Sequence, residues 1–212
     1  MNQVTLVQIT PEAEALMARI ARVSSKNPDN PNYASLLRYC AQHGHWSVFE
    51  QAHMTVDVTT SLAISVQLLR HRSFTFQQFS GRYQDQTLTG GFYLPDKARV
   101  QDPTNRQNSI VSDDEDLTSF LREELTSVYE HCLDSYRRLL DSGIAKEIAR
   151  FALPEGVLTR LYVTGSIRSF IHYIQVRADG EGVQEEHREI ARQIKRIFVE
   201  NLPTVSEAMG WL

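Results

Sequence analysis

The sequence predicts an α+β fold, with one helix-rich domain over residues 1–212 and a small mixed or antiparallel sheet. Three observations support it. Segments with apolar residues at helical spacing outnumber segments that alternate as strands do. No internal repeat and no convincing linker interrupts the chain. The length of 212 residues and the apolar content of 42% allow a sizeable hydrophobic core.

The strands are the segments in which apolar and polar side chains alternate. They are predicted at Val4–Ile9, His53–Thr60 and Leu158–Thr164. A first helix is expected directly after the first strand, with Thr10 as its cap and Pro11 at its first position. Its apolar stripe is assigned to Leu16, Ile20 and Val23.

The other helices repeat apolar residues every three or four positions. A short helix with Leu36, Leu37, Tyr39 and Cys40 ends near Gly44. Another is capped by Ser61, carries the stripe Leu62, Val66 and Leu69, and continues into Arg70-His71-Arg72. The C-terminal half is assigned the helices Asp116–Ser142, Ile144–Phe151, Ser166–Ala178 and Val183–Val199.

Two segments lack a regular pattern. Lys26–Asn32 is polar with two prolines and is predicted to be a loop. Gln84–Asp114 contains Gly90-Gly91, two prolines and a polar tract, and is interpreted as irregular, either a mobile lid or a loop that faces a partner.

Composition narrows the class of protein. The formal net charge is −4, which argues against a long nucleic-acid surface. Of the 22 cations 18 are Arg and four are Lys, and Arg is favoured where a planar fork meets phosphate or carboxylate. Two cysteines exclude a disulfide framework and a four-Cys zinc site. Without a signal peptide or a membrane-length apolar run, a cytoplasmic location is expected.

The densest chemistry lies in Arg70–Tyr83, which holds three Arg and one His among hydroxyls, amides and rings. Its Ser80-Gly81 pair suits a backbone that closely approaches an oxyanion, because Gly lacks a Cβ. Arg82 can add a bidentate contact. Gln67, Arg70 and His71 share one helix face by spacing, opposite the apolar stripe. A solvated basic helix end is the alternative that the spacing leaves open.

Arg70-His71-Arg72, followed after seven residues by Ser80, resembles the signature of the flavin-dependent thymidylate synthase family, and Gly81-Arg82-Tyr83 continues it. Three further elements resemble the family in the same order: His43–Glu50, Ala149–Pro154 and the region from Thr159 to Ala178. Together they cover most of the chain between His43 and Ala178.

The resemblance implies an enzyme that makes dTMP from dUMP. Methylenetetrahydrofolate would be the carbon donor, NADPH the reductant and FAD the hydride carrier, and tetrahydrofolate would be released. It also implies a homotetramer with active sites built at subunit contacts. No metal, nucleic acid or membrane is expected as a partner.

The resemblance also places residues at each ligand. Those expected at dUMP are Gln67, Leu68, Leu69, Arg70, Gln78, Phe79, Ser80, Gly81, Arg82, Arg150 and Arg177. Those expected at FAD are Ser47, Arg70, His71, Arg72, Gln78, Ser166, Ile167, Arg168 and His172. Ser166 stands where Asn is common in the family and His172 where Asn or His occurs, so altered flavin contacts are expected.

Arg177 is the expected catalytic residue. A fixed cation facing the uracil would stabilise negative charge that develops on the ring. By the helical period, Arg168 and His172 share a face that Arg177 does not. Arg177 is therefore expected to act from the helix end or to reach a neighbouring subunit's site.

Other functions are weighed against this one. His43, His45, His53 and Glu50 could bind zinc, and the rings Phe74, Phe76, Phe79 and Tyr83 could stack on nucleic acid. Core packing is favoured for Phe74, Phe76, Cys40 and Cys132, and Ser80 has no evident base that would make it a nucleophile. No G-x-G-x-x-G occurs, so FAD is not expected to bind in Rossmann fashion.

Overall fold

A four-stranded antiparallel sheet organises the computed structural model, which describes residues 2–212. Its strands are β1 (Gln3–Ile9), β2 (His53–Ser61), β6 (Leu158–Ser166) and β3 (Thr75–Gln78), in the order β1-β2-β6-β3. The α+β class and the three predicted strands are confirmed. β3 was not predicted, and it places the Arg70–Tyr83 segment along an edge of the sheet.

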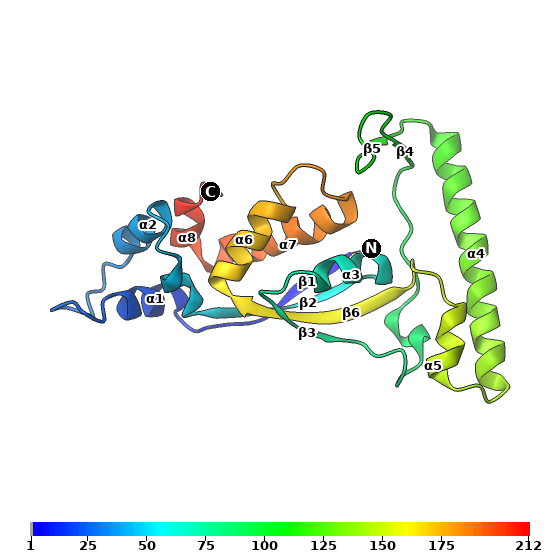
Figure 1. The fold of residues 1–212 in the computed structure, drawn as a ribbon, viewed down its shortest axis with the longest axis horizontal. Helices are drawn as coiled ribbons and strands as arrows, with labels where there is room; N and C mark the ends of the chain where they lie inside the picture. Colours follow the sequence, from blue (N-terminus) through cyan, green and yellow to red (C-terminus); the bar gives the residue numbers. More distant parts are fainter. Residues whose placement is uncertain (1) are drawn as a thin grey trace.

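Helices cover one face of this sheet (Figure 1). They are α1 (Ala13–Ala21), α2 (Ala34–Gln42), the 3-10 turn η1 (Trp46–Glu50), α3 (Leu62–Leu69), α6 (Ile167–Arg177), α7 (Glu185–Asn201) and α8 (Pro203–Ala208). One hydrophobic cluster joins sheet and helices, with Met54 and Val56 of β2, Leu161 of β6, and Phe170 and Ile194 of the helices fully or almost fully buried.

The two central strands each lead directly into a helix through a serine cap. Ser61 accepts a hydrogen bond from the Ile64 amide at the start of α3, and Ser166 accepts one from the Ser169 amide at the start of α6. Because β2 and β6 are antiparallel, with Ser61 opposite Leu158, the two helices start at opposite ends of the sheet. The cap predicted at Ser61 is confirmed.

A long helix stands beyond the end of the sheet. α4 (Glu115–Asp141) is capped by Asp114 and is followed by the short α5 (Lys146–Ala149) and η3 (Arg150–Ala152). Figure 1 shows α4 separated from the layer of α6 and α7. The helix predicted over Ile144–Phe151 is thus a single turn of α-helix and a 3-10 turn.

The segment Gln84–Asp114 attaches α4 to the sheet. It contains the 3-10 turn η2 (Gln86–Thr89) and the hairpin β4 (Arg99–Gln101) with β5 (Ser109–Val111), so the prediction that it is irregular throughout was wrong. The ring of Phe92 stacks on Tyr129 of α4, with centroids 3.6 Å apart. The amide of Gln86 donates to the Tyr136 hydroxyl at 3.1 Å.

The first helix begins later than predicted. Its N-cap is Glu12, and the Thr10 hydroxyl accepts from the His53 amide at 2.9 Å instead of capping the helix. The predicted stripe was also wrong, because Met17 and Ala18 are buried whereas Val23 is exposed. The buried face, with Met17 between the small Ala13 and Ala18, packs α1 against α2 and η1.

The stripe predicted for α3 was wrong as well. Ile64, Ser65 and Leu68 are the buried residues, whereas Val66 is 58% and Leu69 39% exposed. The inner face of α3 packs on the sheet and on α7, so it is shifted from the stripe that the sequence suggested.

Among residues 2–212, no helix is both long enough and apolar enough to cross a membrane.

Candidate functional site

A cavity of about 420 Å³ opens where β6 leads into α6. The residues that line it are Trp46, Glu50, Ser73, Arg168, Ser169, Ile171, His172 and Gln175. Arg168 and His172 both line it, so the inference that they share one face of the helix is confirmed. The cavity combines an aromatic ring, a guanidinium and an imidazole, a set suited to a flat, anionic ligand.

Glu50 holds this end of α6 in place. Its carboxylate accepts from the Ser166 hydroxyl and from the Arg168 guanidinium, each at 2.9 Å. Ser166 also caps α6, so its side chain is already bonded within the chain. The sequence pattern suggested Glu50 only as a metal ligand, although it closes the His43–Glu50 element on which the resemblance rests.

Arg177 ends α6 and turns toward His71 of the same chain. Its Nε donates to His71 Nε2 at 3.0 Å, so Nε2 of His71 must be unprotonated. Burial, then the Arg177 cation and His172, lower the pKa of His71 to about 4. At neutral pH Arg177 therefore meets an uncharged imidazole and keeps its full positive charge. Arg177 therefore lies at the end of α6, with its guanidinium fixed beside His71.

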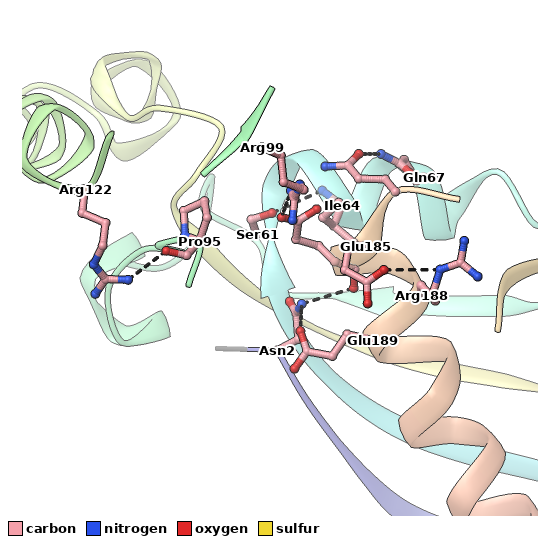
Figure 2. A network of polar contacts seen from close by, with 12 residues as sticks. Asn2, Ser61, Ile64, Gln67, Pro95, Arg99, Arg122, Glu185, Arg188 and Glu189 are labelled. Carbon is pink, nitrogen blue, oxygen red and sulfur yellow. Dashed lines mark hydrogen bonds and ion pairs between the residues drawn. The ribbon is translucent and has the colours of Figure 1, made fainter. Parts of the chain in front are cut away.

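Gln67 joins this group from α3. Its amide donates to Gln184 at 2.6 Å, and its oxygen lies 3.2 Å from Nδ1 of the buried His187 (Figure 2 shows Gln67 and its amide partner). The edge of the His71 ring meets Tyr173, with centroids 4.9 Å apart. The end of α3, the end of α6 and the start of α7 thus meet at one cluster.

Ser80, Gly81 and Arg82 form a turn after β3. The backbone amides of Tyr83 and Gln84 donate to the Ser80 carbonyl, and Arg82 donates to Glu147 at 2.6 Å. A Cβ added at Gly81 would lie 3.7 Å from Arg150 Cδ, so the structure brings these two expected dUMP residues together.

Within the chain, the side chain that approaches Gly81 is that of Gln86, while the approach of an oxyanion stays a prediction. A Cβ at this position would lie only 2.3 Å from Oε1 of Gln86, which is itself buried. The Gln86 amide is fixed by a hydrogen bond to the Leu158 carbonyl at 3.0 Å. The close approach of this side chain therefore requires Gly81.

The expected site residues fall into three groups within one chain. The cavity lies where β6 leads into α6, at the Ser166 end of the strand. The Ser80–Arg82 turn follows β3 at the Leu158 end, where the Phe79 amide donates to the Arg160 carbonyl. Arg177 and His71 meet at the far end of α6, beside the start of α7. Within residues 2–212, no hydrogen bond or ion pair joins Arg177 or His71 to the Ser80–Arg82 turn.

The other expected residues have varied environments. The side chains of Leu68 and Ile167 are buried in the core, so only their backbone groups could meet a ligand. Gln78 donates to Ser65 and Thr159 and is satisfied within the chain. The side chains that are exposed are Ser47, Leu69, Arg70 and Arg72, while Phe79 is half-buried.

The alternatives find less support in the geometry. Residues 2–212 contain no group of three or more His, Cys, Asp or Glu side chains placed to hold a metal ion. Phe74 is buried and Phe76 packs against the core, as expected. Cys40 is buried, as expected, whereas Cys132 is only partly so. The antiparallel sheet lacks the parallel strands of a Rossmann fold.

Comparison with known proteins gives consistent matches. The family model described as "Thymidylate synthase complementing protein" matches residues 5–204. A flavin-dependent thymidylate synthase of Synechocystis is 48% identical over 93% of this chain and 90% of its own length. A probable flavin-dependent thymidylate synthase of Paramecium bursaria Chlorella virus 1 is 43% identical over 94% of this chain and 92% of its own.

A solved structure matches the fold closely. The UMP/dUMP methylase PolB from Streptomyces cacaoi, bound with 5-Br dUMP, superposes with a TM-score of 0.87 at 29% identity. The match covers 99% of this chain and 95% of that one.

Proposed function

Since the chain belongs to the flavin-dependent thymidylate synthase family, we propose that it converts dUMP to dTMP with methylenetetrahydrofolate as carbon donor and NADPH as reductant, and releases tetrahydrofolate. The chain is an FAD-dependent methyltransferase by this membership. The assignment of dUMP is supported by the similar fold of PolB, a UMP/dUMP methylase with 5-Br dUMP bound.

The cavity at the start of α6 fits part of a flavin dinucleotide. FAD, when bound, would accept hydride from NADPH and supply it to the transferred methylene group, which becomes the methyl group of dTMP. Arg168 would bind its phosphates, and His172 and the Ser73 segment would line its path. The volume of about 420 Å³ is at the lower end of the roughly 300–1,000 Å³ range of small-ligand pockets, so one chain would enclose only part of FAD.

Arg177 is proposed to stabilise the reacting uracil. Its hydrogen-bond partner in residues 2–212 is the neutral His71, and it forms no ion pair there. The full charge therefore stays available for negative charge that develops on the ring, which is the kind of preorganised electrostatic stabilisation that contributes most to many enzymes. His71 also fixes the direction in which the guanidinium points.

The observation that carries the proposal of a shared site is that the Arg177–His71 pair and the Ser80–Arg82 turn share no hydrogen bond or ion pair within residues 2–212. We infer that Ser80, Arg82 and Arg150 of another copy of the chain meet the nucleotide beside Arg177. A closed homo-oligomer with such repeated contacts is a symmetric arrangement, and a homotetramer is proposed.

The surface of α4 supports this assembly. Leu121, Leu125, Val128 and Cys132 follow one another at intervals of four, three and four residues and so share one side of the helix. Val128 is 51% and the nearby Phe151 78% exposed. Exposed apolar stripes of this kind mark contacts between proteins.

Flavin content and dTMP formation test the function together. The purified protein is expected to show a flavin absorbance band close to one per chain and to make dTMP only when dUMP, methylenetetrahydrofolate and NADPH are all present. A parallel assay uses UMP in place of dUMP, because PolB is described as a methylase of both UMP and dUMP. A protein that takes up no FAD, or that makes no dTMP with the full mixture, would refute the proposal. The cytoplasmic location stays a prediction.

A further inference from the structure

His187 is a buried imidazole that is not among the expected site residues. It lies in the first turn of α7 with 0% of its side chain exposed. Its Nδ1 is 3.2 Å from Oε1 of Gln67, while Nε2 of Gln67 donates to Gln184 at 2.6 Å. The amide of an expected dUMP residue is therefore bonded through both its oxygen and its nitrogen to the start of α7.

His187 donates through Nδ1. Burial, then Arg177 and His71, lower the pKa of His187 to about 3, so the ring is neutral at physiological pH. An amide oxygen only accepts, so the single ring proton must sit on Nδ1 when Gln67 Oε1 is the partner.

The other nitrogen of His187 belongs to a ring that lies near a second unpaired group. Nε2 of His187 and the hydroxyl of Tyr173 are both buried without a hydrogen-bond partner in residues 2–212. Their ring centroids are 5.7 Å apart. One is an acceptor and the other a donor, so a single water molecule or a small movement would join them. Tyr173 would then hold His187 in the same tautomer.

We propose that His187 is a positioning residue that sets which end of the Gln67 amide faces the substrate. With the oxygen of Gln67 turned to His187, one hydrogen of its amide group bonds to Gln184 and the second is free to donate to a carbonyl of the pyrimidine ring. The inference rests on the proposed function, because it requires dUMP to bind at Gln67.

Gln184 alone cannot set this orientation. Its own amide carries both a donor and an acceptor, so it can turn to match either orientation of Gln67. His187 offers only an N–H in this tautomer, so it removes the ambiguity. A reversed Gln67 would present its oxygen to a ring carbonyl and repel it.

Substitutions at His187 separate positioning from packing. Asn places an amide nitrogen where Nδ1 of the imidazole lies, and Gln places one where Nε2 lies. We expect His187→Leu and His187→Gln to weaken dUMP binding by about tenfold, the loss of one hydrogen bond. His187→Asn can donate from the same place but can also turn its oxygen toward Gln67, so we expect a loss of only about two- to threefold, less than that of the Leu and Gln variants. Calorimetric dUMP titration of the FAD-loaded protein gives Kd, and KM should rise more than kcat falls.

A double-substitution cycle decides whether His187 acts through Gln67. Gln67→Ala should weaken dUMP binding, and adding His187→Leu to it should cost nothing further. Equal losses from His187→Leu with and without Gln67 would overturn the inference, as would tighter binding by the Gln variant than by the Asn variant. Wild-type binding by Gln67→Ala would overturn both the inference and the place of Gln67 in the proposed site.

Discussion

Substitution of Gly81 by alanine tests how the Ser80–Arg82 turn is built. The backbone of Gly81 lies outside the left-handed region, so strain of the main chain is not the issue. The new Cβ would lie 2.3 Å from Gln86 Oε1, more than 1 Å inside an ordinary contact. Gln86 would have to move and would lose its buried bond to Leu158.

The expected loss of stability in Gly81→Ala follows from the loss of the hydrogen bond between Gln86 and Leu158. Leaving a buried carbonyl unpaired costs about 1–3 kcal/mol. At about 2 kcal/mol, a chain of this length should lose about 4–8 °C in Tm. Thermal unfolding at fixed protein and FAD concentrations measures it. In a Gln86→Ala background the clash is absent, so Gly81→Ala should then cost less than about 0.5 kcal/mol, the size of a neutral surface change. An equal loss in both backgrounds would refute the reasoning.

Three further predictions concern charge, pH and assembly. Arg177→Ala should fold normally but lose about 10²–10³-fold in dTMP formation, and wild-type turnover would remove Arg177 from the chemistry. Because the folded-state pKa values of His71 and His187 lie near 4 and 3, below the unfolded value of about 6.5, the unfolded state binds more protons. The free energy of unfolding, measured by denaturant titration, should be highest above pH 6.5 and fall toward pH 4. His187→Leu should make this free energy less dependent on pH. A variant with the same pH dependence as wild type would contradict the prediction. Val128→Glu should dissociate the oligomer in sedimentation, whereas exchanging Glu130, exposed on the opposite side of the same helix, for Gln should not. An intact Val128→Glu assembly would exclude this face of α4 as a contact.

Local sequence patterns predicted the strands and helices in which apolar and polar residues follow a regular period. β2 and β6 alternate in apolar and polar residues because one side of each faces the helices, and α4, α6 and α7 are long enough for their period to show. In β1 only Val4 is buried, so its pattern is weaker. β3 has only four residues, and its partner β6 lies more than eighty residues away in the chain, so its pairing leaves no local signal.

Where sequence reasoning failed, contacts between distant parts of the chain decide the outcome. On α3, Val66 and Leu69 are apolar but exposed, because the packing of Ile64 and Leu68 on the sheet and α7 sets the buried face. The spacing of the motif could not show this. Exposed apolar residues beside a binding motif are consistent with a face that another copy covers.

The candidate site was predicted through its motifs rather than its geometry. Arg168 and His172 line one cavity, and Arg177 donates to His71 at the far end of the same helix. His187 carries no such signal. It approaches Gln67 from 120 positions away, and a single buried histidine in an amphipathic helix is indistinguishable from core packing until the fold is known.

The central claim is that dTMP is made at a site to which one copy of the chain contributes Arg177 and another copy contributes Arg150 with the Ser80–Arg82 turn. Co-assembly of an Arg177→Ala chain with an Arg150→Ala chain tests it most directly. Each variant alone should be inactive. In randomly mixed oligomers about a quarter of the shared sites would combine an intact Arg177 with an intact Arg150, so dTMP formation should return to about a quarter of wild type. Mixed oligomers that stay inactive would contradict the account.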